Sequence, residues 1–299
     1  MPRLFYCDHH TLPLPEGHRF PAAKYAMLRS LLEADGVYQL EPAPFACRER
    51  IELAHDPAYV ASVLDGSVDP RVMRRIGFPW SEGLIRRTLA SVGGTLAAAA
   101  DALATGFGGN LAGGTHHAFY AEGSGFCVFN DLAIAIRTLG LRAAVIDLDV
   151  HQGDGTAAIF EGDSSVLTVS VHGANNFPFR KQRSCLDVAL PDGTGDAEYL
   201  ERVQRILPSV ADFRPEIVFY QSGVDGLATD RLGRLQLSHE GLLARDRTVF
   251  GFVRERAIPV VVTLGGGYSD PIDHTVMGHA NTFRTAWAVL QPLTHPERL

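Results

Sequence analysis

The strongest constraint on the fold is a set of short, almost continuous apolar runs in the second half of the chain. These runs are rich in β-branched residues and cover residues 143–148, 166–171, 216–222 and 258–264. A strand with one solvated face alternates apolar and polar residues, whereas a strand that is covered on both faces reads as uninterrupted apolar sequence. The runs therefore predict central strands of a mainly parallel sheet.

Helical patterns separate these runs. The predicted helices cover residues 22–34, 81–103, 131–139 and 238–256. Ser81 stands where the second of these helices needs an N-cap. Strands that alternate with helices are typical of an α/β fold, in which right-handed crossovers place helices on the faces of the sheet. The first 80 residues are richer in proline, and outside their one helix we expect them to be irregular.

Composition narrows the class of protein. The chain has 299 residues, of which 46% are hydrophobic and 20% charged, as in globular proteins. Its formal net charge is −7, from 27 basic and 34 acidic residues, which argues against nucleic acid as a partner because nucleic-acid binding needs a basic surface. We find no signal peptide and no run of 18 apolar residues, so we expect a cytoplasmic protein with no membrane partner. Since no linker-like stretch divides the chain, we also expect one domain over residues 1–299.

The four cysteines do not indicate a disulfide framework. None of them forms a CxxC pair; they are Cys7, Cys47, Cys127 and Cys185. A chain of this length needs no disulfides for stability, so we expect small buried thiols. The sequence leaves the oligomeric state open.

Chemically active side chains follow three of the predicted strands. Asp147, Asp149 and His151 end the first apolar run, Asp225 follows the third, and Tyr268 follows the fourth. The carboxyl ends of parallel strands share one edge of the sheet, and ligands bind at that edge in α/β proteins. We therefore expect these side chains to gather at one site.

Three of these side chains have the chemistry of a catalytic metal site. Residues i and i+2 of an extended segment point the same way, so Asp149 and His151 can converge, and Asp225 can join them from its own strand end. Two carboxylates and one imidazole, with coordination positions left open, suit a catalytic divalent metal. Zinc is the first choice for such a site, and Fe²⁺ or Co²⁺ would also fit.

Two adjacent histidines offer acid–base chemistry. His116 and His117 follow a pair of glycines in "LAGGTHHAFYAEGSGFCVFND". Histidine titrates near neutral pH, and the contact of one ring nitrogen sets the protonation of the other. Asp147 and Asp154 are not needed as metal ligands, so the pattern predicts two histidine–aspartate pairs that flank one metal.

Taken together, these segments resemble the zinc-dependent histone deacetylase superfamily. The resemblance rests on four motifs in order: AGGTHHA…SGFC…ND, DLDVHQGDG, SGVDGLATDRLG and GGGY. It spans about residues 16–285 and implies the arginase/deacetylase fold, which has a mainly parallel central sheet between two layers of helices and its active site at the carboxyl ends of the strands. The segments HQGDG and TDRLGRLQLSHEGLLARD are most similar to the class IV branch and its bacterial relatives.

The resemblance also implies a role for each matching residue. Zinc would be held by Asp149, His151 and Asp225. His116 and His117 would be the catalytic pair, backed by Asp147 and Asp154 respectively, and Tyr268 would stabilise the oxyanion. The walls of the substrate tunnel would be Gly125, Phe126, Phe177 and Gly266. A structural potassium ion would lie near Asp147, His151, Ser170 and Val171.

The implied activity is removal of acetyl or other acyl groups from lysine side chains of proteins or peptides. A small acetylated amine such as a polyamine is an alternative substrate, and a non-catalytic protein that binds acylated amines is an alternative of a different class. A third alternative is a binuclear manganese enzyme of the arginase type. The positions that would hold its additional carboxylates are Gly153 and Gly223, which argues against it.

Overall fold

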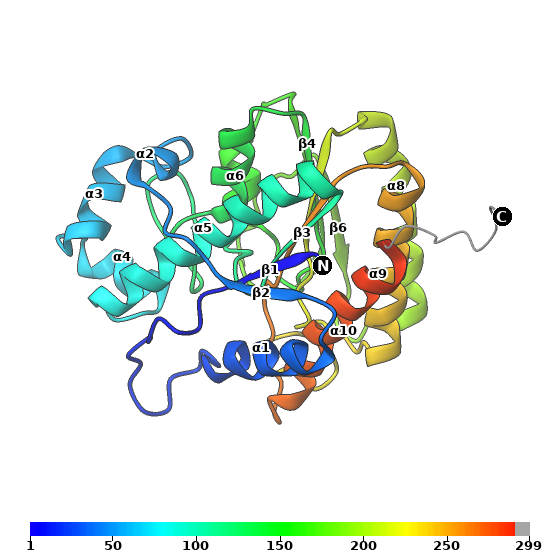
Figure 1. The fold of residues 1–299 in the computed structure, drawn as a ribbon, viewed down its shortest axis with the longest axis horizontal. Helices are drawn as coiled ribbons and strands as arrows, with labels where there is room; N and C mark the ends of the chain where they lie inside the picture. Colours follow the sequence, from blue (N-terminus) through cyan, green and yellow to red (C-terminus); the bar gives the residue numbers. More distant parts are fainter. Residues whose placement is uncertain (291–299) are drawn as a thin grey trace.

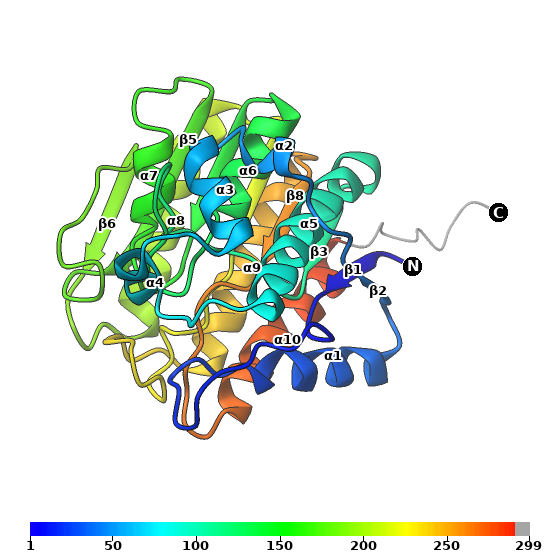
Figure 2. The ribbon, with the colours of Figure 1, turned by 90° about the vertical axis from the view of Figure 1, so that its left-hand side faces the viewer.

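The strands of the protein form one parallel sheet (Figure 1). In the computed structural model, which describes residues 1–290, eight strands pair in the order β2-β1-β3-β8-β7-β4-β5-β6, and every pairing is parallel. The strands are β1 (Arg3–Tyr6), β2 (Gln39–Pro42), β3 (Phe107–Asn110), β4 (Ala143–Asp147), β5 (Val166–Gly173), β6 (Leu186–Leu190), β7 (Ile217–Gln221) and β8 (Val260–Thr263). Figure 2 shows β6 and β2 at opposite sides of the sheet.

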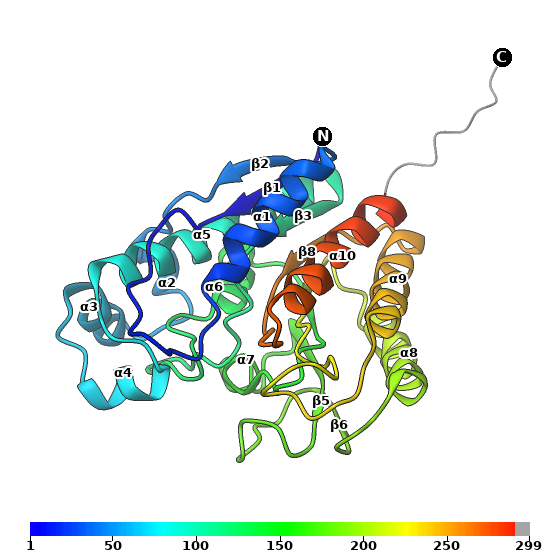
Figure 3. The same cartoon turned by 90° about the horizontal axis from the view of Figure 1, so that it is seen from below.

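Helices cover both faces of the sheet, so the molecule has three layers (Figure 3). One layer holds α1 (Ala23–Asp35), α8 (Asp196–Phe213), α9 (His239–Glu255) and α10 (Asp273–Leu290). The other holds α5 (Glu82–Thr105), α6 (Asp131–Leu139) and α7 (Asp154–Ile159), beside which lie α2 (Arg48–Ile51), α3 (Pro57–Asp65) and α4 (Pro70–Ile76). None of the helices within residues 1–290 is long and apolar enough to cross a bilayer.

The predicted fold class is confirmed, and each apolar run coincides with a strand of the sheet to within two residues at either end. Every side chain of β4, β7 and β8 is buried, as their continuous apolar sequence indicated. The pattern missed the other strands for physical reasons. β3 reads FGGN and lacks apolar bulk, while β6 is an edge strand whose first four residues alternate between half-buried and exposed positions.

The predicted helices are present with shifts of one or two residues at their ends. The Ser81 hydroxyl accepts a hydrogen bond from the Leu84 N–H at 3.1 Å, which confirms the N-cap of α5. The first 80 residues, however, are more regular than expected, since they contain β1, β2 and the short helices α2, α3 and α4. Helices α3 and α4 each begin at an Asp-Pro pair, in which the aspartate caps the helix and the proline already has the φ angle of the first turn. This signal in the sequence could have revealed both helices.

The cysteines depart in part from the expectation of buried thiols. Cys7 and Cys127 are buried, but Cys47 and Cys185 are exposed. Cys47 lies just before α2 and Cys185 just before the edge strand β6, both at the surface of the molecule. All four are free thiols, so the absence of a disulfide framework agrees with the sequence analysis.

The register of the central strands brings their carboxyl ends together. Asp147 at the end of β4 pairs with Gln221 at the end of β7, which in turn pairs with Thr263 at the end of β8. The loops that follow these strands therefore leave the sheet side by side. These are the loops that carry the polar residues singled out in the sequence.

Candidate active site

Asp149, His151 and Asp225 converge at this edge of the sheet. The Nδ1 atom of His151 lies 3.0 Å from Asp149 Oδ1 and 3.0 Å from Asp225 Oδ2, and one ligand atom from each residue lies within 4.8 Å of the others. All three side chains are buried. The structure thus brings together the three residues chosen from the sequence, and their role as metal ligands stays a prediction.

Backbone groups hold the two carboxylates in place. Asp225 Oδ1 accepts the N–H of Val150 at 2.9 Å, and Asp149 Oδ2 accepts the N–H of Gly266 at 2.6 Å. Position 266 has to be glycine, because a Cβ atom there would lie 1.9 Å from Asp225 Oδ2. The glycine loop after β8 therefore lies against both carboxylates and holds Asp149 through the Gly266 N–H.

The electrostatics of the cluster favour a cation. Burial alone would lower the pKa of His151, but the flanking Asp149 and Asp225 raise it to about 10. Burial and the neighbouring Asp149 raise the pKa of Asp225 to about 7. Two carboxylates thus compete for one positive charge at His151 Nδ1. This donor set of two oxygens and one nitrogen fits a divalent metal.

The surroundings leave no room for the carboxylates of a second metal. A Cβ atom on Gly153 would lie 2.4 Å from Asp147 Oδ2, and one on Gly223 would lie 2.5 Å from Asp149 Oδ2. Real Cβ atoms essentially never approach so closely, so a longer acidic side chain at either position would collide with the cluster. The geometry therefore argues against a binuclear, arginase-type centre.

His116 and His117 each pair with a buried carboxylate. The Nδ1–H of His116 donates to Asp147 Oδ2 at 2.7 Å, and that of His117 donates to Asp154 Oδ1 at 2.6 Å. The two rings are neighbours, with centroids 4.1 Å apart, and His116 Nε2 lies 3.9 Å from Asp149 Oδ1. The pairing agrees with the one that the family resemblance implied, and it leaves both Nε2 atoms available for chemistry.

The surroundings move the pKa values of the two histidines in opposite directions. Burial opposes a charge on His116, but Asp147 and Asp149 outweigh it and raise its pKa to about 9. Burial lowers the pKa of His117 to about 4, helped by repulsion from His116, and Asp154 offsets this only in part. The local environment thus favours a charged His116 beside a neutral His117.

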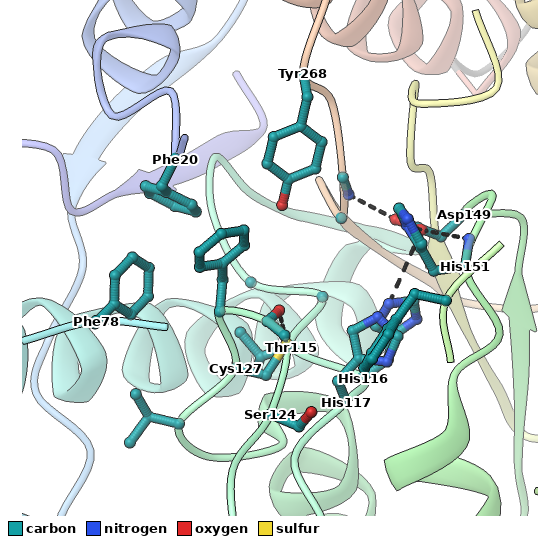
Figure 4. Close-up of a pocket in the computed structure, with 18 of the residues that line it drawn as sticks. Phe20, Phe78, Thr115, His116, His117, Ser124, Cys127, Asp149, His151 and Tyr268 are labelled. Atoms are coloured by element: carbon teal, nitrogen blue, oxygen red, sulfur yellow. Dashed lines mark hydrogen bonds and ion pairs between the residues drawn. The ribbon is translucent and has the colours of Figure 1, made fainter. Parts of the chain in front are cut away.

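The site opens into a cavity of about 490 Å³. Figure 4 shows the Tyr268 hydroxyl directed into it, with Phe20 and Phe78 to one side and Asp149 and His151 to the other. Burial keeps the Tyr268 pKa well above its ordinary value, so its hydroxyl remains a donor at neutral pH. All four predicted tunnel residues line this cavity; they are Gly125, Phe126, Phe177 and Gly266.

Aromatic rings form the walls of the cavity. Phe177 meets the His117 ring edge to face, with centroids 4.9 Å apart, and Phe126 lies 6.1 Å from the Tyr268 ring. Phe20 and Phe78 continue the apolar wall behind Phe126, at centroid distances of 5.4 and 5.2 Å. The passage beside the cluster thus suits an apolar chain.

Several supporting residues were not identified from the sequence. Asp131 holds the histidine loop, because its carboxylate accepts the N–H groups of Gly114 at 3.0 Å and Thr115 at 2.7 Å. Buried Lys24 donates to the Gly267 carbonyl at 3.3 Å and so contacts the glycine loop from behind. Asp131 ends the first family motif, which was a usable signal, whereas nothing local in the sequence marks Lys24.

The residues of the predicted potassium site come from β4, from the loop after it and from the neighbouring strand β5. Ser170 on β5 pairs in register with Asp147, Val171 follows it, and His151 lies in the loop after β4. The Ser170 hydroxyl contacts His172 Nδ1 at 3.0 Å. Potassium binding at these residues stays a prediction.

Known proteins resemble this chain over most of its length. An uncharacterized protein of Picosynechococcus sp. (strain ATCC 27264 / PCC 7002 / PR-6) is 45% identical over 294 residues, which cover 95% of this chain and 98% of that protein. Histone deacetylase 2 of Arabidopsis thaliana is 31% identical over 270 residues, which cover 84% of this chain and 70% of that protein.

Solved structures and family models agree with this. The crystal structure of acetylpolyamine aminohydrolase from Burkholderia pseudomallei is similar in fold, with a TM-score of 0.79 and 21% identity, over 97% of this chain and 99% of that one. The family model described as the histone deacetylase domain matches residues 18–282. The chain therefore belongs to the histone deacetylase family.

Proposed function

We propose that this protein is a zinc-dependent amidohydrolase that removes acetyl or other acyl groups from the amine of lysine side chains. The observation that carries the proposal is one cavity lined by members of a buried Asp–His–Asp cluster, by the imidazoles of two histidine–aspartate pairs and by a tyrosine. Membership of the deacetylase family supports the general activity. The similarity in fold to an acetylpolyamine aminohydrolase keeps acetylated polyamines as the alternative substrate class.

Asp149, His151 and Asp225 would hold the metal. When bound, a divalent ion would polarise the substrate carbonyl and make a nearby water a stronger nucleophile. Gly266 and Val150 keep the two carboxylates oriented through their N–H groups, so the ligand set is arranged before any metal arrives.

The remaining residues would move protons and stabilise charge. Neutral His117, with Nδ1–H bound to Asp154, accepts the proton of the attacking water at Nε2 and later passes it to the departing amine. The attacking water forms the C–O bond first and gives a tetrahedral oxyanion. The C–N bond then breaks as the amine takes up the proton, which gives a carboxylate and free lysine. The Tyr268 hydroxyl donates a hydrogen bond to the oxyanion, and charged His116 adds electrostatic stabilisation.

The test is an amide-cleavage assay before and after metal removal. We expect zinc-loaded protein to deacylate acetyl-lysine peptides, chelation to abolish turnover, and zinc to restore it. Asp225→Ala should lose both bound zinc and activity, whereas Asp212→Ala, an exposed aspartate on α8, should retain both. Zinc-loaded protein that binds acyl-lysine peptides but never cleaves them would instead support the non-catalytic alternative.

The oxyanion role is tested by removal of one hydroxyl. Tyr268→Phe should lower kcat by about 100- to 1000-fold, the cost of one oxyanion donor, while zinc content is unchanged. Tyr120→Phe, at an exposed tyrosine outside the cavity, is the matched control and should behave like the parent protein. Unchanged turnover in Tyr268→Phe would rule out the proposed role.

A further inference from the structure

The entrance side of the cavity is lined by arginines. Arg19, Arg75 and Arg234 line the main cavity, and Arg19 and Arg231 line an adjoining cavity of about 280 Å³ together with Leu232 and Tyr268. All four arginines are exposed. Within residues 1–290, Asp149 of the metal cluster is the one acidic residue that lines either cavity. The route to the site is therefore basic, although the whole chain carries a net charge of −7.

Two of these arginines have their charge balanced by acids and two do not. Arg75 forms an ion pair with Glu122, and Arg234 forms one with Asp192 at 3.1 Å. Arg19 and Arg231, which we call the entrance arginines, form no ion pair with any residue of the described chain.

Asp230, the acidic residue next to Arg231 in the sequence, is bound by backbone N–H groups. The Asp230 carboxylate accepts the N–H groups of Tyr268 at 2.6 Å, Leu232 at 2.8 Å and Gly233 at 2.9 Å. These bonds turn it inward and tie the loop of Arg231 to the backbone of Tyr268. Arg231 and Tyr268 therefore line the same small cavity, while the Asp230 carboxylate is bound by backbone N–H groups.

We propose that the entrance arginines form an anion subsite that selects acyl-lysine substrates with an acidic residue beside the acylated lysine. The inference rests on the proposed function and names its substrate class. Tyr268 borders both cavities, so a substrate whose acyl group lies at the metal cluster leaves its outer part against Arg19 and Arg231. A guanidinium presents a planar fork of N–H donors that matches a carboxylate.

The same charges disfavour polyamines. An acetylated polyamine keeps further protonated amines, and these would face two unpaired guanidinium groups at the entrance. Like charges that face each other reduce both encounter rate and affinity, which is a common way to exclude a wrong partner. Entrance arginines of this kind would thus favour acyl-lysine peptides over acetylated polyamines, the two substrate classes that the sequence leaves open.

The experiment compares kcat/KM for three acetyl-lysine peptides that differ only in Asp, Asn or Lys beside the acetyl-lysine, together with acetylspermidine. We expect the Asp peptide to exceed the Lys peptide by about five- to tenfold, as two exposed charge pairs allow, and acetylspermidine to be poorest. The preference should shrink at high salt because the charges are exposed to solvent.

Substitutions then assign the preference to the two residues. In the double variant Arg19→Gln, Arg231→Gln the three peptides should become nearly equal, and in Arg19→Glu, Arg231→Glu the Lys peptide should become the best. The control is Arg254→Gln, an exposed arginine near the end of α9, which precedes the opposite, amino end of β8. It should keep the parent preference.

Two results overturn the subsite: equal kcat/KM for all peptides in the parent protein, or an Asp preference that survives in the double glutamine variant. Failure of the proposed function looks different, since then no peptide is cleaved. In that case the affinities of the same peptides, labelled with a fluorophore, are measured on zinc-loaded protein by fluorescence anisotropy. Tighter binding of the Asp peptide that is lost in the double variant supports the subsite, and equal binding overturns it.

Discussion

The two histidine–aspartate pairs are almost identical in composition and geometry, yet their surroundings differ. Both have a buried carboxylate at 2.6–2.7 Å from Nδ1. His116 also lies beside Asp149 of the Asp–His–Asp cluster, whereas His117 packs against the Phe177 ring and receives repulsion from His116. The environment therefore raises the pKa of His116 to about 9 and lowers that of His117 to about 4.

This contrast shows that a shared motif does not imply a shared role. Two titratable groups whose pKa values are pushed apart by their environments are suited to opposite tasks in one reaction. In the proposed mechanism, a neutral His117 would accept a proton and a charged His116 would stabilise negative charge. Adjacent residues of one loop would then supply both functions.

The largest expected effect comes from removal of either imidazole. In zinc-loaded protein, His117→Ala should lower kcat by about 1000-fold, the cost of a general base, and His116→Ala should cost at least tenfold less. Zinc content should be unchanged in both variants, which excludes metal loss as the cause. Equal losses, or a greater loss in His116→Ala, would contradict the assignment of the base to His117.

Asp147 and Asp154, the partners of the two histidines, should differ in their effect on zinc affinity. Asp154→Asn and Asp147→Asn should each lower kcat by about 10- to 100-fold, since each removes the group that orients a ring. Only Asp147→Asn should also weaken zinc binding, because Asp147 Oδ1 accepts the N–H of Asp149 at 3.1 Å and its charge lies behind the cluster. Competition with a chelator measures the zinc affinity of each variant. Equal affinities in Asp147→Asn and Asp154→Asn would show that the two aspartates contribute equally to zinc binding.

The smallest effect concerns His55, another buried histidine, which has no carboxylate partner within the described residues. His55 Nδ1 contacts the Tyr120 carbonyl at 3.2 Å, Nε2 accepts the Asn130 N–H at 2.8 Å, and burial lowers the His55 pKa to about 4. In the unfolded chain its pKa is near 6.5, so the unfolded state binds more protons between pH 4 and 6.5. The stability that His55 contributes is thus complete above about pH 6.5 and is lost as the pH falls toward 4.

Urea denaturation at pH 7 and pH 5 tests this contribution. His55→Gln can keep both contacts without titrating, so its loss of unfolding free energy over this interval should be smaller than the parent's by about 2 kcal/mol. The unfolding free energy of His55→Gln can differ from that of the parent by the same amount at both pH values, because only the change between pH 7 and pH 5 reports the titration of His55. If the unfolding free energies of the two proteins change equally between pH 7 and pH 5, the His55 pKa is not lowered on folding.

The sequence was most informative where local pattern and sheet topology agree. Asp149 and His151 could be paired from their i, i+2 spacing, and Asp225 from its position after a neighbouring strand, because parallel strands must end at one edge. The four buried strands were predicted for the same reason, since a strand covered on both faces carries an unmistakable apolar run.

Features that depend on packing between distant segments could not be predicted. Phe20 and Phe78 reach the cavity from the first 80 residues, whose strands are short and whose helices α2 to α4 give weak patterns. The charge of the entrance likewise depends on which acids pair with which arginines, and that is decided only when Glu122 and Asp192 take their places. The choice of aspartate for each histidine came from family resemblance rather than from spacing.

The hydrogen bonds that complete the Asp–His–Asp cluster span long stretches of chain. Val150 binds Asp225 across 75 residues, and Gly266 binds Asp149 across 117. A ribosome-bound chain therefore has no finished site until its last strand and glycine loop have been synthesised. Under the proposed function, zinc would be bound only after nearly the whole polypeptide has been made. A truncation before Gly266 would yield a product without the hydrogen bond that Gly266 donates to Asp149.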